Sequence, residues 1–295
     1  MRIRRTPSEV VFDAIIYVIV GLISIACLLP FTHTLFASIS KPEGVLSHVG
    51  LYWFPDGFFL RGYQIVLQNP EIWTGYLNTI NYVVAGTLIC LFVTTLAAYA
   101  LSHRLLFARL IMLLIIFTMM FSGGLIPFYN MMVNDLHLQN TMWAVVLPGA
   151  LSAYYMIIIR TSFGGIPQSL EESAKIDGAN YFSILARIYL PLSKATLAVI
   201  ALYCIVAQWN AYFWAMIFLR DRLKYPLQLF LREILIQNDT SKMVTAANVD
   251  YSQMDKYRPL VRFCVTIVAT LPIICLYPFL QKYFVKGIMV GSIKG

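Results

Sequence analysis

The feature that most constrains the fold of this chain is a set of six long apolar segments. They lie at about residues 11–36, 76–102, 108–130, 141–162, 192–219 and 262–284. As a helix, each is long enough to cross a hydrocarbon layer about 30 Å thick. A helix also satisfies its own backbone hydrogen bonds where no water is present. The sequence therefore predicts an all-α fold, with residues 1–295 forming a single polytopic membrane domain of six transmembrane helices.

Composition supports a chain whose solvent is largely lipid. Only 12% of the residues are charged and the mean hydropathy is +0.72, whereas soluble domains carry about 25% charged residues. The net charge of +8 is therefore better explained by membrane topology than by nucleic-acid binding. The five cysteines lie in apolar runs without C-x-x-C spacing, so we expect neither a metal site nor a disulfide framework.

The distribution of basic residues predicts the orientation of the chain. With both termini in the cytoplasm, the cytoplasmic side holds Arg2, Arg4, Arg5, Arg104, Arg109, Arg160, Lys175, Arg187, Lys194, Lys282, Lys286 and Lys294. The two shorter outside loops then hold only Lys41 and Arg61, as the positive-inside rule expects. The long outside segment 220–260 departs from this rule because it carries several basic residues, although acidic residues are mixed with them.

A polar stretch from Pro167 to Pro191 interrupts the apolar pattern. Ser169 and Glu172 have the spacing of a capping box, and Asp177-Gly178 is a typical helix stop. Asn180 then begins a second short helix, and Pro191 suits the first turn of the long helix that follows. The second helix is expected to place Tyr181, Ile184, Leu185 and Ile188 on one apolar stripe.

This stretch resembles the EAA loop of ABC importer permeases, whose pattern is E-A-A-x3-G-x9-I-x-L-P. The matching residues are Glu172-Ser173-Ala174, Gly178, Ile188 and Leu190-Pro191, and Ser173 departs from the pattern by one small residue. Three further segments resemble the carbohydrate-uptake permeases of this family. They are the lead-in Arg160–Leu170, the run Gln208–Phe213, and the chain ending at Gln281–Gly287 and Gly291–Gly295.

The resemblance implies a non-catalytic permease subunit that imports sugars, with oligosaccharides as the expected class, by alternating access. Its expected partners are a second homologous permease, two ATPase subunits and an extracellular or periplasmic substrate-binding protein. ATP and Mg would be bound by the ATPase subunits, and no cofactor is expected in this chain, which has no phosphate-binding G-x-x-x-x-G-K-[ST] loop.

The resemblance also implies site residues. The loop 163–191 would contact the ATPase, with Glu171 and Glu172 as salt-bridge partners for arginines of that subunit. The coupling residues are Glu171, Glu172, Ser173, Ala174, Asp177, Gly178, Ala179, Leu190 and Pro191. The tail Gly291, Ser292, Ile293, Lys294 and Gly295 would reach the interface between the two ATPase subunits.

Polar residues within apolar segments are candidates for a substrate path. Amides and aromatic rings suit sugar hydroxyls and sugar faces, but such side chains also join helices to one another. The candidates are Asn78, Asn81, Gln208, Trp209 and Asn210. We further hypothesise that basic residues of the 220–262 region suit uronic acids, namely Arg220, Arg222, Lys224, Arg232, Arg258 and Arg262.

Two other classes of protein remain as alternatives. A secondary transporter usually carries ionisable residues in mid-span to bind a coupling ion, and Asp and Glu are nearly absent from the centres of these segments. A non-transport scaffold would not need the 167–191 loop at this spacing. Co-purification with an ATPase subunit discriminates between these classes.

Overall fold

The computed structural model describes residues 6–103, 106–121, 123–236 and 254–292. Over this part of the chain the secondary structure is helical and contains no strand, which confirms the predicted all-α class. The longest helices are α1 (Pro7–Ile39), α4 (Pro70–Ser102) and α16 (Met254–Ser292). The others are α2 (Pro42–Ser47), α3 (Arg61–Gln68), α5 (Ala108–Met120), α6 (Leu125–Asn130), α7 (Met142–Val146), α8 (Ala153–Gly164), α9 (Gln168–Ile176), α10 (Tyr181–Ile184), α11 (Leu190–Leu192), α12 (Lys194–Trp209), α13 (Phe213–Phe218) and α14 (Leu227–Ile236).

Short irregular helices join several of these elements. Two are π-helical turns, η1 (Met131–Asp135) and η3 (Leu185–Tyr189), and two are 3₁₀ turns, η2 (Leu147–Gly149) and η4 (Arg222–Lys224). Such turns often mark a hinge or a functional site within a longer helix.

Several of the predicted spans are bent helix pairs. By length and composition, three helices can cross a membrane, and up to six spans result if each bent pair counts as one. The predicted span at 141–162 consists of α7 with η2, followed by α8, and the two parts are bent by 49° relative to each other. The predicted span at 192–219 was wrong as a continuous helix, because α12 ends at Trp209 and α13 begins at Phe213. Hydropathy does not detect such breaks, since the residues at the break are themselves mostly apolar.

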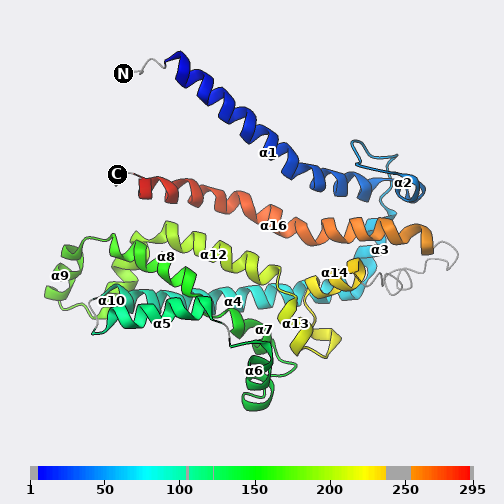
Figure 1. Ribbon diagram of the computed structural model, residues 1–295. Helices are drawn as coiled ribbons and strands as arrows, with labels where there is room; N and C mark the ends of the chain where they lie inside the picture. Colours follow the sequence, from blue (N-terminus) through cyan, green and yellow to red (C-terminus); the bar gives the residue numbers. More distant parts are fainter. Residues whose placement is uncertain (1–5, 104–105, 122, 237–253, 293–295) are drawn as a thin grey trace. The chain divides into compact units, whose positions relative to one another are not determined.

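The chain divides into two compact units. One comprises Met1–Pro70 with Glu233–Thr270, and the other comprises Glu71–Arg232 with Leu271–Gly295. The single domain expected for residues 1–295 stays a prediction. In the second unit, α8 packs against both α5 and α12. Figure 1 shows α9 and α10 at one end of the bundle of α4, α5, α8 and α12, with α6, α7 and α13 at the other end.

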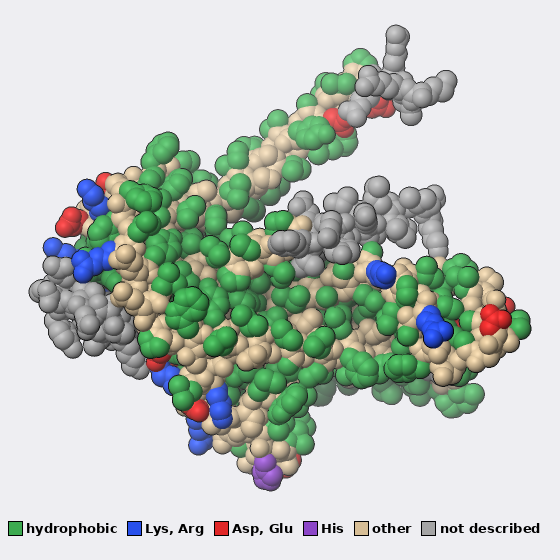
Figure 2. Space-filling view, turned by 180° about the vertical axis from the view of Figure 1, so that it is seen from behind, with side chains coloured by type: hydrophobic (Ala, Val, Ile, Leu, Met, Phe, Trp, Pro, Cys, Tyr) green, Lys and Arg blue, Asp and Glu red, His purple; other side chains and the backbone are tan. Residues whose placement is uncertain are grey.

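Hydrophobic side chains cover much of the helix surface, as Figure 2 shows. On α1, for example, Phe12, Tyr17 and Leu22 are exposed. The lipid-facing side of a membrane helix carries this kind of surface. The buried core of the second unit lies mainly between α4, α8, η3 and α12, and includes Ala98, Ile159, Phe163, Ile184 and Ile200.

Candidate functional site

The predicted EAA loop forms a short helix, α9, with well-defined ends. Its N-cap is Pro167, whose side chain makes no capping bond, so the predicted capping box of Ser169 and Glu172 was wrong. Ser169 already lies inside the helix, which begins at Gln168. At the other end Ala179 N–H donates to Ala174 O (2.9 Å) and Gly178 N–H donates to Lys175 O (3.0 Å). This is a Schellman motif, and Gly178 has the positive φ of +79° that it requires.

The second short helix of the loop also begins as predicted. The side chain of Asn180 accepts a hydrogen bond from Ser183 N–H (2.8 Å) and caps α10. Ile184 and Leu185 are buried as expected, but Tyr181 is exposed and does not belong to the buried stripe. The polypeptide then bends by 85° between Leu192 and Lys194. Pro191 therefore lies in the separate short helix α11, and the prediction that it opens the next long helix was wrong.

The carboxylate of Glu171 is the centre of a hydrogen-bonded cluster beneath α9. One oxygen, Oε1, lies 3.0 Å from Nε2 of His103 and 2.7 Å from Nζ of Lys175. The other, Oε2, accepts a hydrogen bond from the hydroxyl of Tyr189 (2.6 Å). Glu171 is only 5% exposed. We refer to Glu171, His103, Lys175 and Tyr189 as the carboxylate cluster.

The electrostatics of the carboxylate cluster favour an ionised Glu171. Burial raises the pKa of Glu171, but hydrogen bonds from Lys175 and Tyr189 and the neighbouring His103 lower it, and the net pKa lies below its usual range. A buried carboxylate is costly unless donors compensate for lost water. Three side-chain donors do so here, which is why a charged residue is tolerated at this position.

The His103 ring faces acceptors on both sides. Its Nδ1 lies 2.7 Å from the carbonyl oxygen of Tyr99, and its Nε2 faces Glu171. A carbonyl and a carboxylate can only accept, so the ring lies between two acceptors that belong to α4 and α9. His103 directly follows the last residue of α4. The carboxylate cluster therefore joins α9 to the end of α4.

Aromatic rings surround the carboxylate cluster. The rings of Tyr99, Phe163 and Tyr189 pack edge to face, with centroid separations of 5.0 Å for Tyr99–Tyr189 and 5.2 Å for Phe163–Tyr189. The hydroxyl of Tyr99 donates to Tyr181 O at the start of α10 (3.1 Å). Arg160 on α8 donates through Nε to Leu101 O (2.7 Å) at the end of α4. These contacts fix α4, α8 and η3 around the buried side of α9.

The outer side of α9 is exposed. Ile176 is 86% exposed, and Glu172, Ser173 and Asp177 are exposed as well. Just beyond the loop turn, Phe182 is also exposed. The expectation that both Glu171 and Glu172 offer salt bridges to a partner is therefore corrected. Glu171 is engaged inside its own chain, and only Glu172 faces outward.

The remaining coupling residues lie close to this cluster. Ala174 and Ala179 pack against the core next to Glu171, as does Leu190, whereas Gly178 and Pro191 are exposed. A groove of about 450 Å³ runs along the turn, lined by Ala174, Asp177, Gly178, Ala179, Asn180, Ser183, Ile184, Arg187 and Ile188. In the predicted tail, Gly291 and Ser292 end α16. Ile293, Lys294 and Gly295 lie outside the described residues.

The candidate path residues separate into different environments. The side-chain amide of Asn78 donates to Leu223 O (2.7 Å) and Tyr225 O (3.1 Å). Asn78 therefore joins α4 to the segment after α13, and its place on the substrate path stays a prediction. Asn81 is exposed on α4, and Asn210 is exposed at the C-terminus of α12. Trp209 is buried, with its ring 6.2 Å from that of Tyr76.

Gln208 is the candidate that lines a cavity inside the second unit. The cavity has a volume of about 260 Å³ and is lined by Cys90, Pro148, Gly149, Leu151, Ser152, Tyr155, Cys204, Ala207 and Gln208. A Cβ at Gly86 or Gly149 would lie 2.7 or 2.8 Å from Nε2 of Gln208. These two glycines therefore leave the room that the amide occupies. The breaks after η2 and α12 both lie beside this cavity.

The basic residues proposed for uronic acids are partly engaged elsewhere. Arg222 forms an ion pair with Glu71, and Lys224 donates through Nζ to Asn140 O (2.8 Å). Arg222 and Lys224 therefore have partners within the chain, whereas Arg220 is exposed, and the uronic-acid hypothesis stays untested. Residues 237–253 of the predicted outer loop lie outside the described residues.

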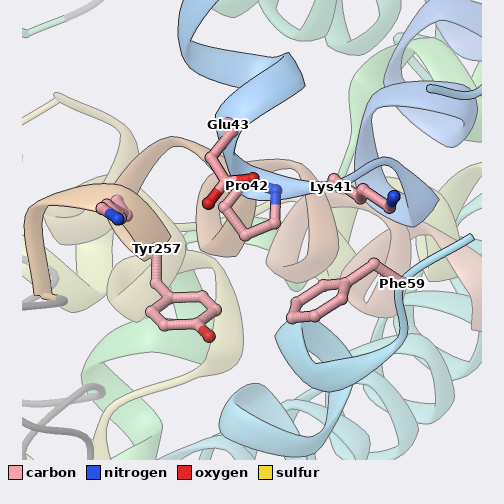
Figure 3. Close-up of a pocket in the computed structure, with 6 residues that line it drawn as sticks. Lys41, Pro42, Glu43, Phe59 and Tyr257 are labelled. Carbon is pink, nitrogen blue, oxygen red and sulfur yellow. The ribbon is translucent and has the colours of Figure 1, made fainter. Parts of the chain in front are cut away.

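A second pocket lies in the first unit (Figure 3). It has a volume of about 330 Å³ and is lined by Lys41, Pro42, Glu43, Phe59, Lys256 and Tyr257. The rings of Phe59 and Tyr257 are stacked, with centroids 6.1 Å apart. Glu43 opposes the charge of the two lysines, so the pocket has no single sign of charge and does not indicate a ligand class.

Comparison with known proteins places the chain in a family. A model of the family described as "Binding-protein-dependent transport system inner membrane component" matches residues 7–290. The polygalacturonan/rhamnogalacturonan transport system permease protein YtcP of Bacillus subtilis (strain 168) is 39% identical, over 96% of this chain and 98% of its own length. Protein LplC of the same organism is 39% identical over 99% and 97%.

A solved structure is similar over the whole fold. One chain in the crystal structure of a bacterial ABC transporter involved in the import of the acidic polysaccharide alginate superposes with a TM-score of 0.83 at 31% identity. The match covers 96% of this chain and 99% of that chain. The protein belongs to the family of binding-protein-dependent transport system inner membrane components, as the EAA resemblance predicted, and is an ABC importer permease.

Sequence reasoning missed the residues that hold α9 in place. His103, Tyr99 and Tyr189 carry no motif, and His103 is 68 residues from Glu171 in the chain. One signal was available. Glu171 lies three residues before Ala174 and four before Lys175, so these residues share one face of a helix.

Proposed function

We propose that this chain is a membrane-spanning permease subunit of an ATP-driven importer of acidic oligosaccharides. The observation that carries the proposal is α9, a short helix whose outer side is exposed while its inner side is attached to the bundle through Glu171. A helix of this kind has the geometry needed to receive movement from a separate protein. Exposed Glu172, Ile176 and Phe182 offer one charged and two apolar contacts to that protein.

The partners follow from the same proposal. Two ATPase subunits bind ATP and Mg and supply the energy, a second homologous permease completes the membrane path, and a substrate-binding protein delivers the sugar. In this chain, movement of α9 is passed to α4 and to the bend before α12, which switches access as a rigid-body movement. Both chain termini and α9 lie on the cytoplasmic side.

The substrate class is supported by the relatives and by one cavity. Two similar proteins are a polygalacturonan/rhamnogalacturonan transport permease and a chain of a transporter that imports alginate. Gln208 lines a cavity beside two helix breaks, and an amide can hydrogen-bond sugar hydroxyls. Gln208→Leu is expected to raise the KM for import of galacturonate oligosaccharides by the assembled complex, whereas an unchanged KM would exclude Gln208 from the path.

The experiment that tests the coupling role uses Gly178. Among the described residues, no atom outside Gly178 and its two chain neighbours lies within 4 Å of the position that a Cβ would take at Gly178, but its φ is one that other residues rarely adopt. Gly178→Ala and Gly178→Arg share a backbone cost of about 1–2 kcal/mol, and only the arginine adds bulk on the outer side. Each variant is expressed with the ATPase subunits, and co-purification, ATP hydrolysis and sugar import are measured.

We expect Gly178→Ala to retain most of the bound ATPase and Gly178→Arg to lose ATPase binding or coupled import. If both variants bind the ATPase, hydrolyse ATP and import sugar normally, the proposal that this turn contacts the ATPase is overturned. Import that needs an ion gradient and no ATPase subunit would instead favour a secondary transporter.

A further inference from the structure

We propose that Glu171 is a positioning residue that locks α9 to α4 and to η3, so that a displacement of α9 moves all three as one body. This inference rests on the proposed function, because it concerns how the displacement is transmitted. Glu171 itself does not contact the ATPase in this account. Its function is to connect α9 to the helix bundle.

The first argument is the sparse attachment of α9. Among the nine residues Gln168–Ile176, Glu171 is the buried one and Ala174 is half-buried. Ala174 presents a single methyl group to the core, and the two larger aliphatic side chains of the helix, Leu170 and Ile176, are both exposed. Apolar packing therefore contributes little to holding α9, and the attachment depends on the carboxylate.

The second argument is that the donors come from separate elements. His103 follows α4, Tyr189 ends η3, and Lys175 belongs to α9 itself. One carboxylate therefore joins three parts of the chain through contacts of 2.6–3.0 Å. Hydrogen bonds to a charged group are shorter and stronger than those between neutral groups, which suits a contact that transmits force.

The third argument concerns where each contact leads. His103 also bonds Tyr99 O, so a force on its ring acts on the last turn of α4. Tyr189 lies in a π-helical turn that precedes the 85° bend before α12. Movement of α9 therefore reaches both a long helix and a bend, and these are the elements that a change of access must move.

The test separates binding of the ATPase from use of its energy. Glu171→Gln keeps the shape of the side chain and removes its charge. The complex that carries this substitution is reconstituted with its binding protein in liposomes. A labelled galacturonate oligosaccharide is the transported probe. Two quantities are measured, the amount of ATPase that co-purifies and the ATP hydrolysed per sugar imported. Tyr189→Phe is a second variant that removes one donor and keeps the ring packed.

We expect normal co-purification and a rise in ATP hydrolysed per sugar of at least about fivefold for Glu171→Gln, the lower end of common coupling effects. Tyr189→Phe should raise the ratio by less. Glu171→Ala, His103→Ala and the double variant form a cycle. The ATP hydrolysed per sugar by the double variant should be little higher than that of the more affected single variant, because both single changes break the same contact.

A purely structural role would lower the yield and stability of the complex and leave this ratio unchanged. An unchanged ratio in both Glu171→Gln and Tyr189→Phe would overturn the inference, and so would additive effects in the cycle. Loss of ATPase binding in Glu171→Gln would also overturn it, since Glu171 would then act in docking. These outcomes differ from failure of the proposed function, in which Gly178→Arg leaves ATPase binding and import normal.

Discussion

The two ends of α4 are held in different ways, although each has a side-chain contact between a carboxylate and a distant segment. At its first turn, Glu71 pairs with Arg222, and the two side chains are 30% and 33% exposed. Beyond its last turn, Nε2 of His103 lies 3.0 Å from Glu171, and the two side chains are 22% and 7% exposed. An exposed ion pair contributes about 0–1 kcal/mol, whereas a hydrogen bond to a charged group contributes about 1.5–3 kcal/mol.

The end near Glu71 does not depend on its ion pair. Asn78 donates to two carbonyl oxygens, Tyr82 OH donates to Lys224 O (2.7 Å), and Thr79 Oγ1 accepts from Leu227 N–H (2.8 Å). These bonds hold the segment after α13 at many points. At the other end, Arg160 and Tyr99 bond α4 to α8 and α10, but α9 is attached to α4 mainly through the carboxylate of Glu171. The difference indicates a segment fixed at many points at one end of α4 and a helix attached mainly through one side chain at the other.

The largest effect is expected when the charge of Glu171 is removed. Glu171→Gln should destabilise the purified protein by about 3 kcal/mol at neutral pH, the upper end for a hydrogen bond to a charged group, because three donors lose their charged acceptor. The folded pKa of Glu171 lies below its ordinary value of 4.5. Its stabilisation is therefore present above that value and is lost as the pH falls through the folded pKa.

Thermal unfolding of both proteins across pH checks this prediction. The difference in free energy of unfolding should be constant near neutral pH and shrink on acidification. A difference that stays the same at low pH would show that the charge of Glu171 is not what stabilises the cluster.

An intermediate effect is expected at Asn78. Asn78→Ala removes two hydrogen bonds to backbone carbonyl oxygens and should cost about 1–3 kcal/mol. Asn81→Ala is the matched control, because Asn81 is exposed on the same helix. Thermal stability and the KM for import are measured for both. A raised KM with unchanged stability in Asn78→Ala would show that this residue acts in the substrate path and not in helix packing.

The smallest effect is expected at Arg222. Arg222→Ala should cost at most about 1 kcal/mol, and less at high salt, because its pair with Glu71 is partly exposed. Unfolding at low and high salt measures this directly. If Arg222→Ala lowers the free energy of unfolding as much as Glu171→Gln does, the two ends of α4 do not differ as described.

Local sequence signals predicted the turn of the coupling loop well, because its chemistry is local. Gly178 and Asn180 form the stop and the start that their residue types favour. The directions of Glu171 and Asn78 could not be predicted, since their partners are up to 68 and 147 residues away. The breaks at 150–152 and 210–212 were also missed, because hydropathy measures composition and not helix continuity.

The central claim is that α9 contacts an ATPase subunit, and Ile176 offers the most direct measurement. The natural cysteines are replaced and Ile176→Cys is introduced into the assembled complex, where its exposed position permits labelling without disturbing the core. A short thiol–amine cross-linker is then applied to the membranes. The account predicts a cross-link from position 176 to the ATPase subunit and no labelling by an impermeant thiol reagent added outside intact cells. Labelling from outside, with no cross-link to the ATPase, would contradict it.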